Sequence, residues 1–222
     1  MKTLTVKSND ANQRLDKFLA KTFKNMPISE MYKGIRKKNI KLNNKRCHIA
    51  DKLKEGDVIS LYLKDEFLVD CPKTYDFLTA SSKLDIVYED ENILLLNKKA
   101  GLLVHPDNNE HRDTLIARVQ RYLYEKNEYN PENENSFTPA LVNRIDRNTA
   151  GIVIAAKNSA ALRILNQKLK DHEIRKFYFC IVHGIMEKKQ DTLEAFLIKD
   201  EKNNRVFINN QKKAGARGIS TR

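Results

Sequence analysis

The chain has 222 residues, and its 41 lysines and arginines against 29 aspartates and glutamates give a formal net charge of +12. Hydrophobic residues make up 41% of the sequence, which supports a buried core and argues against wholesale disorder. No apolar run reaches the roughly 20 residues that span a bilayer. The three cysteines form no Cys-x-x-Cys pair, which argues against a disulfide framework and a thiolate zinc site.

These features predict a cytoplasmic protein that makes no membrane contact. A strong positive balance points first to a polyanionic partner, most often nucleic acid. The alternative is an ordinary lysine-rich surface, and net charge alone does not decide between the two.

Much of the charge lies in residues 31–46, which contain seven cations and no acid. Before this run, Leu15, Phe18, Leu19 and Phe23 have the spacing of one helix face. A second helix is expected over residues 30–38, with Ser29 as its N-cap and Asn39 as a left-handed C-cap. Short strands are expected at residues 40–43 and 58–63.

This order of features resembles the S-four RNA-binding domain over residues 13–63. The matching segments read R-L-D-K-F-L, I-K-L-N-N-K-R and L-K-E-G-D-V-I. The resemblance implies that structured RNA binds through basic residues of this segment. With the neighbouring cations of the same run, the expected contacts are Arg14, Lys17, Lys33, Arg36, Lys37, Lys38 and Lys41.

The rest of the chain predicts an α+β domain with a mixed, mainly antiparallel sheet. We expect residues 1–69 to form the first domain, 70–83 a linker and 84–222 a second domain. Strands are expected at residues 84–88, 92–96, 152–156, 176–182, 192–198 and 205–208. Helices are expected after Asp113, as an N-cap, and from Ser159, whereas residues 126–137 resemble a loop with local disorder.

Several familiar sites find no support in the sequence. There is no phosphate-binding glycine loop and no Gly-x-Ser-x-Gly elbow. The five histidines have no metal-ligand spacing, so no metal site is expected.

One polar segment does suggest chemistry, because residues 143–151 place Asp146 between Arg144 and Arg147 just before an apolar strand. Flanking guanidinium groups favour an ionised carboxylate, which is a competent covalent nucleophile. The alternative is a turn in which the carboxylate binds its own backbone and the arginines lie in solvent.

Three segments resemble the RluA-type pseudouridine synthase family in the correct order. Residues 143–151 are similar to its H-R-L-D-x-x-T-S-G signature, and residues 98–106 are similar to K-P-x-G-L-x-V-H-P. Lys176 to Tyr178, followed by V-H-G, resembles its K-x-Y strand. Asn143 stands where the family has histidine, and Lys99, Ile145 and Ala150 are further departures.

The resemblance implies isomerisation of uridine to pseudouridine in RNA, most plainly large-subunit ribosomal RNA, without metal or cofactor. After the base has left its stack, Asp146 would attack the anomeric carbon or carbon six of uracil, or promote glycal formation; these alternatives stay open. Arg144 would fill the gap left by the base, and Tyr178 would stack on the uracil. His105 and Arg147 would contact the RNA.

Family members continue beyond the point that corresponds to Arg222, into a segment with an R-T-H-Q-I-R-like motif. We therefore expect the catalytic domain to be incomplete here and turnover by these residues alone to be low. The alternative function is a non-catalytic RNA-binding or ribosome-associated module with a defective synthase domain.

Overall fold

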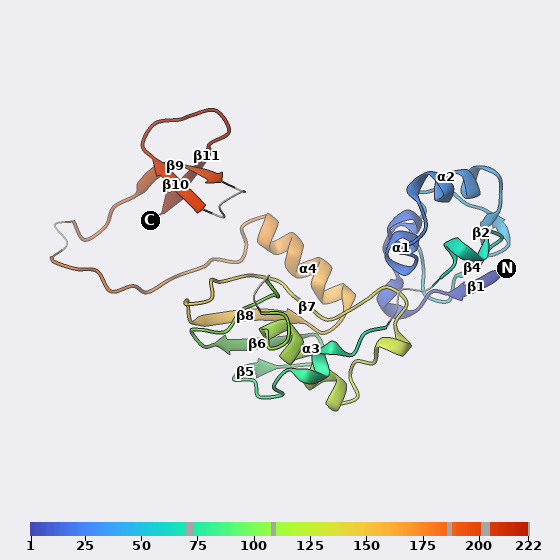
Figure 1. Ribbon diagram of the computed structural model, residues 1–222, viewed down its shortest axis with the longest axis horizontal. Helices are drawn as coiled ribbons and strands as arrows, with labels where there is room; N and C mark the ends of the chain where they lie inside the picture. The colour runs from blue at the N-terminus through green and yellow to red at the C-terminus, as the bar shows by residue number, and fades with distance from the viewer. Residues whose placement is uncertain (70–72, 108–109, 186–187, 201–204, 222) are drawn as a thin grey trace. The chain divides into compact units, whose positions relative to one another are not determined.

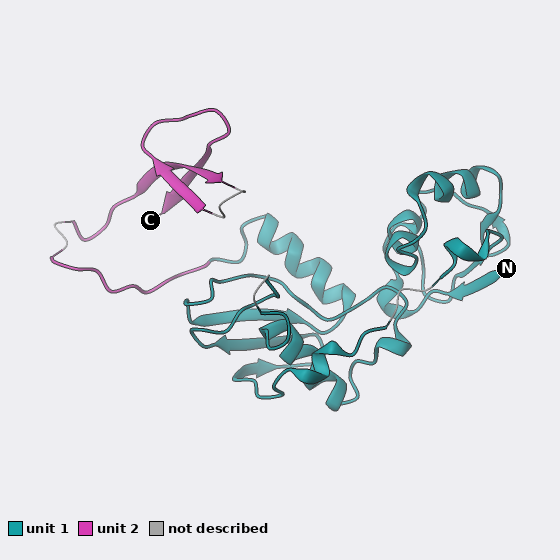
Figure 2. Cartoon of the chain, viewed as in Figure 1, with its two compact units in different colours: residues 1–175 teal, residues 176–222 magenta. Residues whose placement is uncertain are grey.

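The computed structural model describes residues 1–69, 73–107, 110–185, 188–200 and 205–221. Contacts divide it into two units, Met1–Arg175 and Lys176–Arg222 (Figure 2). We call residues 1–69 the N-terminal module, residues 73–175 the central module, and Lys176–Arg222 the C-terminal unit. The first two belong to the same unit, and each has a hydrophobic core of its own.

The N-terminal module is a four-stranded antiparallel sheet with two short helices (Figure 1). Its strands, β1 (Lys2–Thr5), β2 (Ile40–Leu42), β3 (Lys45–Arg46) and β4 (Val58–Leu61), have the order β1-β4-β2-β3. The helices are α1 (Leu15–Thr22) and α2 (Ile28–Arg36). The predicted apolar face is confirmed, because Leu15, Phe18, Leu19 and Phe23 are all fully buried.

Both predicted ends of α2 are wrong. The helix begins at Ile28, and Pro27 rather than Ser29 is its N-cap. At the other end Lys38, not Asn39, has the left-handed conformation, with φ of 62°. The amide of Asn39 donates to the carbonyl of Gly34 at 2.8 Å, and the amide of Lys38 donates to Ile35 at 3.1 Å. This pattern satisfies the last carbonyls of the helix one residue earlier than the sequence predicts.

The central module is a second four-stranded antiparallel sheet, with the order β5-β6-β8-β7. Its strands are β5 (Ile86–Glu89), β6 (Ile93–Lys98), β7 (Ala140–Leu141) and β8 (Gly151–Ala156), and its helices are α3 (Leu115–Glu125) and α4 (Ser159–Lys170). The α+β class with a mainly antiparallel sheet is thus confirmed. Short 3-10 turns at Asp76–Thr79 and Pro131–Asn133 complete it, and Phe77 from the first turn is buried in the core.

The predicted helix after Asp113 is present, but its cap is not Asp113. Thr114 is the N-cap, and its hydroxyl accepts a hydrogen bond from the amide of Ala117 at 3.4 Å. The carboxylate of Asp113 instead pairs with Arg118 at 2.6 Å and accepts from the amide of Ser81. Because its carboxylate binds the guanidinium of Arg118, Asp113 does not cap the helix.

The loop that the sequence marks for disorder is ordered where it contacts the N-terminal module. The fully buried carboxylate of Asp10 accepts hydrogen bonds from the Ser136 hydroxyl at 2.6 Å and from the Asn135 amide at 2.7 Å. The backbone amide of Lys7 adds a third donor at 3.1 Å. These donors offset the cost of burying the polar side chain, so the polar loop is held by hydrogen bonds rather than by an apolar face.

The C-terminal unit contains a three-stranded antiparallel sheet with the order β10-β9-β11. Its strands are β9 (Leu193–Asp200), β10 (Arg205–Asn209) and β11 (Arg217–Thr221), so the predicted strands near residues 192–198 and 205–208 are confirmed. The strand predicted at residues 176–182 is wrong, because that segment has no regular secondary structure. Within the described residues, no helix has the length and apolarity needed to cross a membrane.

A charge network joins β5 to α3 and to the end of β8. The carboxylate of Glu89 accepts from the ammonium groups of Lys126 at 2.7 Å and Lys157 at 3.0 Å, and from the hydroxyl of Tyr122 at 2.7 Å. Burial alone would raise the pKa of Glu89, but these hydrogen bonds outweigh it and lower the pKa to about 2. The network therefore stabilises the fold only while Glu89 is ionised.

We predict that this network makes the protein sensitive to acid. Because the folded-state pKa of Glu89 is about 2 against an ordinary 4.5, its stabilisation is complete above pH 4.5 and is lost as the pH falls toward 2. The free energy of unfolding in urea should therefore differ between wild type and Glu89→Gln by up to about 3 kcal/mol above that range and converge below it.

The matched control is Glu66→Gln, since Glu66 is exposed and, within the part of the chain that the structure describes, forms an ion pair with Lys64 alone. That variant should follow the wild type at every pH. If the difference in the free energy of unfolding between wild type and Glu89→Gln does not change across this pH range, the lowered pKa of Glu89 is contradicted.

Candidate active site

The segment that contains Asp146 is the loop between β7 and β8. Its first residues continue the sheet, because the amide of Val142 donates to the carbonyl of Ile154 at 2.8 Å. The side-chain amide of Asn143 then binds β8 as a backbone peptide group would. Its Oδ1 accepts a hydrogen bond from the amide of Ile154 at 2.8 Å, and its Nδ2 donates one to the carbonyl of Ile152 at 3.1 Å. Asn143, where the family has histidine, thus fixes the start of the loop to β8.

Within the loop, the alternation of side chains exposes the candidate nucleophile. Ile145 is partly buried against the core of the central module, whereas Arg144, Asp146 and Arg147 on either side of it are exposed. The carbonyl of Asp146 accepts from the amide of Thr149 at 3.1 Å, which closes a turn. The buried isoleucine therefore anchors the loop, and the carboxylate faces solvent.

A buried lysine connects this loop to the end of β6. Lys98 is only 1% exposed, and its Nζ donates to the carbonyl oxygens of Lys99 at 3.0 Å, Leu102 at 2.8 Å and Arg147 at 3.0 Å. We call these contacts the Lys98 clamp. An ammonium has three protons to donate, so the three carbonyls satisfy it completely without an acidic partner.

A reciprocal backbone contact reinforces the Lys98 clamp. The amide of Gly101 donates to the carbonyl of Arg147 at 2.8 Å, and the guanidinium Nε of Arg147 donates back to the carbonyl of Gly101 at 3.1 Å. Gly101 has φ of +91°, a conformation that disfavours residues with a side chain. The glycine thus lets the turn after β6 meet the loop of Asp146.

The electrostatics link Lys98 to Asp146. Burial lowers the pKa of Lys98, and the negative charge of Asp146 partly offsets that effect. Similarly, burial lowers the pKa of His105, and the positive charge of Arg144 lowers it further. Four of the residues singled out in the sequence (His105, Arg144, Asp146 and Arg147) are therefore part of, or interact with, this one loop.

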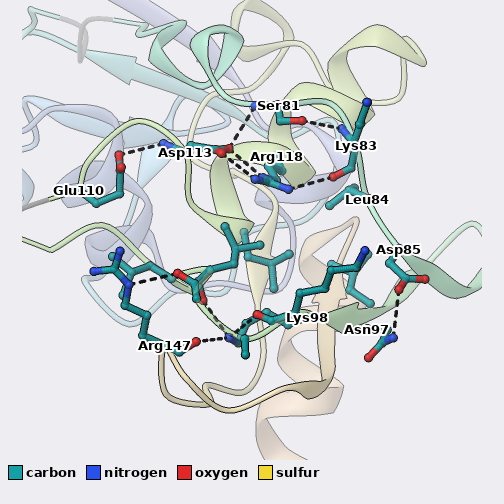
Figure 3. A pocket seen from close by; sticks show the side chains of 17 residues that line it. Ser81, Lys83, Leu84, Asp85, Asn97, Lys98, Glu110, Asp113, Arg118 and Arg147 are labelled. Atoms are coloured by element: carbon teal, nitrogen blue, oxygen red, sulfur yellow. Dashed lines mark hydrogen bonds and ion pairs between the residues drawn. The ribbon is translucent and has the colours of Figure 1, made fainter.

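A pocket of about 620 Å³ adjoins the Lys98 clamp (Figure 3). Lys98 and Arg147 line one part of it, and Asp113 and Arg118 line another. Its wall carries both signs of charge, and several leucines contribute apolar surface. The loop of Asp146 therefore borders a hollow rather than a flat surface.

The basic residues predicted to bind RNA lie on the N-terminal module, and most of them are exposed. On α2, Met31, Gly34 and Ile35 face the core, whereas Lys33 and Arg36 of the helix and Lys37 directly after it are exposed. Lys17 and Lys38 are exposed as well, and Lys41 is half-buried. Arg14 differs, because its guanidinium is bound to both oxygens of Asp16 at 3.0 and 2.8 Å, which neutralises part of its charge.

Tyr178, the third predicted catalytic residue, lies in the C-terminal unit and is 62% exposed. Its stacking role stays a prediction. Among the described residues, no group of histidine, cysteine, aspartate and glutamate side chains is arranged to hold a metal ion.

Sequence reasoning gave Lys98 no role, although a signal was present. Side chains alternate along β6, so Lys98 falls on the same face as Leu94 and Leu96, both of which are buried. A lysine at a core position of an apolar strand requires internal acceptors. Period-two alternation therefore indicates a buried ammonium, even though it does not identify the carbonyls.

We predict that Lys98→Met destabilises the protein by about 2–4 kcal/mol, because methionine keeps most of the volume but leaves the carbonyls of Leu102 and Lys99 without their donor. Urea unfolding measures the change. The control is Lys99→Met, an exposed neighbour, which should alter stability by no more than about 0.5 kcal/mol. Equal stability of Lys98→Met and wild type would show that the clamp contributes nothing to the fold.

Comparison with known proteins gives the family. The profile of the RNA pseudouridylate synthase family matches residues 92–221, and that of the S4 domain matches residues 13–59. The chain is 39% identical over 220 residues to an uncharacterized RNA pseudouridine synthase of Mycoplasma capricolum, with 92% of this chain and 70% of the relative covered.

It is also 33% identical over 208 residues to ribosomal large subunit pseudouridine synthase C of Vibrio cholerae, with 90% of this chain and 61% of the relative covered. Among solved structures, human RNA pseudouridylate synthase domain containing 4 aligns with a TM-score of 0.41 and 10% identity, over 61% of this chain and 51% of that one. On the strength of the family match and the Mycoplasma relative, this chain is a member of the RNA pseudouridylate synthase family with an N-terminal S4 domain.

Proposed function

We propose that this protein isomerises uridine to pseudouridine in RNA, with Asp146 as the nucleophile. The observation that carries the proposal is the exposed carboxylate of Asp146 on a loop fixed at three places. Asn143 binds it to β8, Ile145 anchors it in the core, and the Lys98 clamp holds its carbonyl at Arg147. A carboxylate fixed in this way can meet a reacting carbon without a large reorganisation.

The reaction is a balanced rearrangement within one nucleotide. The bond between the anomeric carbon and N1 of uracil breaks, the base turns, and a bond forms between the anomeric carbon and C5. C5 loses a proton, N1 gains one, and no electrons are exchanged with another molecule. Asp146 supplies an oxygen nucleophile for the anomeric carbon or carbon six, or assists glycal formation. Where a covalent bond to Asp146 forms, that bond breaks again in the last step and the carboxylate is regenerated.

The cations around Asp146 suit an RNA substrate whose target base has left the stack. Arg144 is exposed beside the nucleophile, and its charge acts on His105. A guanidinium plane can stack where the base was and can also bind phosphate. We assign this role to Arg144, RNA contacts to His105 and Arg147, and stacking on the flipped uracil to Tyr178.

We further propose that the RNA is ribosomal, from the large subunit, and that the protein acts in the cytoplasm. Support comes from the exposed basic residues of α2 and from the name of the Vibrio relative, a ribosomal large subunit pseudouridine synthase. Phosphate contacts by Lys33, Arg36 and Lys37 would position the RNA without reading its sequence.

The central test is Asp146→Asn, which keeps the shape of the side chain and removes the nucleophile. Wild type and variant are incubated with a large-subunit ribosomal RNA transcript, and pseudouridine is measured by mass spectrometry of the nucleosides. We expect the product to fall at least about 1,000-fold, while RNA affinity changes by less than about twofold. Asp171→Asn, an exposed carboxylate at the end of α4, is the control and should leave both values unchanged.

Both proteins are assayed as the 222-residue chain and as a fusion with the region of the Mycoplasma relative that extends beyond the match. An undiminished yield of pseudouridine from Asp146→Asn would refute the claim that Asp146 is the nucleophile. RNA binding without product from either wild-type form would favour the non-catalytic RNA-binding alternative. Abundant product from the 222 residues alone would instead overturn the expectation of low turnover.

A further inference from the structure

A small hollow of about 210 Å³ lies on the N-terminal module between α2 and the segment that follows β4. Its main walls are Lys33 from α2, Lys37 directly after that helix, and Tyr62, Leu63 and Lys64 from the segment after β4. The volume is below the roughly 300–1,000 Å³ of pockets that enclose drug-sized ligands. A single planar ring system is therefore a better match to it than a larger molecule.

Close backbone packing fixes the walls of this hollow. A Cβ atom at Gly34 would lie 3.1 Å from side-chain carbons of both Ile40 and Leu63, so the glycine allows α2 to approach the sheet. The amide of Tyr62 donates to the carbonyl of Asn39 at 2.7 Å, which joins the two sides. The backbone on both sides of the hollow is thus held at a fixed separation by close packing and a hydrogen bond.

Tyr62 contributes an aromatic residue to the lining of the hollow. The residue is 43% exposed, although it directly follows a strand whose last two residues are buried. The ammonium of Lys41 lies 5.4 Å from the centre of its ring, and Lys41 is not among the residues that line the hollow. The cation therefore lies beside the ring and outside the hollow, and the ring itself remains partly exposed.

The rim has an excess of positive charge. Lys33 pairs with Glu30 at 3.0 Å, and Lys64 pairs with Glu66 at 3.4 Å. Neither Lys37 nor Lys41 forms an ion pair within the described residues, and the ammonium of Lys41 lies over the Tyr62 ring. Two cations are thus available beside an exposed aromatic ring.

We propose that this hollow binds one unstacked base of the RNA, with the base stacked on Tyr62 and the adjoining phosphates bound by Lys37 and Lys41. An aromatic face with flanking cations is the common solution for single-stranded nucleotides, because every base offers a π face. The proposal rests on the proposed RNA-binding function and deepens it. The N-terminal module then selects RNA with an unpaired nucleotide, in addition to its contacts with phosphate.

The test compares two fluorescent RNA probes by anisotropy: a stem-loop with a uridine loop, and a fully paired duplex with the same number of phosphates. Tyr62→Ala should weaken stem-loop binding about 5- to 100-fold, the usual range for the loss of one base–aromatic stack. Binding of the duplex, and of the stem-loop with abasic loop residues, should stay the same. Tyr62→Phe keeps the ring and should bind as the wild type does.

Two further variants separate stacking from charge and from general surface effects. Tyr62→Ala should not change the dependence of affinity on salt, whereas Lys37→Gln should reduce the slope by about 0.7–0.9, the value for one phosphate contact. Tyr88→Ala is the control, since Tyr88 is similarly exposed but lies beside Asp90; it should have no effect.

Equal losses for stem-loop and duplex in Tyr62→Ala, or no loss at all, would overturn the base-binding site while leaving RNA binding intact. Failure of the wild type to bind either probe would instead refute the proposed RNA-binding function.

Discussion

The structure around Asp146 depends on one buried charge. Lys98 ends an apolar strand on the face that also carries Leu94 and Leu96, so its ammonium cannot remain in water. A charge removed from water is tolerated only when its protons are bound, and three backbone carbonyls bind them. Because one of these carbonyls belongs to Arg147, the requirement of a core lysine also determines where the neighbouring Asp146 lies.

This arrangement separates the support of the carboxylate from its chemistry. The Lys98 clamp acts through main-chain oxygens, so Lys98 does not neutralise Asp146 by direct pairing. The three side chains that we propose to meet RNA remain exposed on the loop, namely Arg144, Asp146 and Arg147. Cationic side chains thus lie near the carboxylate of Asp146, and Lys98 does not bind it directly. This arrangement suits a nucleophile that meets a polyanion.

Sequence patterns predicted the elements that are determined by residues close to one another in the chain. The spacing of Leu15, Phe18 and Leu19 indicated α1, and the apolar run of residues 92–96 indicated β6, because burial on one or two faces leaves a clear period. The loop motif of Asp146 was also apparent, since the residues that carry the family resemblance are contiguous in the chain.

What the sequence could not supply were contacts that depend on a distant partner. Asp113 has the chemistry of a helix cap, but Arg118 binds it, so Thr114 caps α3. The polar loop at residues 126–137 resembles a disordered segment, yet Asp10, more than 120 residues away, orders it. Residues 176–182 are a nearly continuous apolar and aromatic run that is typical of a strand, but such a run produces a strand only where a neighbouring strand is available for hydrogen bonding.

The most direct test of this account is hydrogen exchange, measured by NMR, in wild type and Lys98→Met. The amide of Gly101 is bonded to the carbonyl of Arg147, and the amide of Thr149 is bonded to the carbonyl of Asp146. Loss of the Lys98 clamp should reduce the protection of both amides, while the β6–β8 ladder stays protected under native conditions. Unchanged protection of Gly101 and Thr149 would show that the loop of Asp146 is positioned without Lys98, which contradicts the central claim.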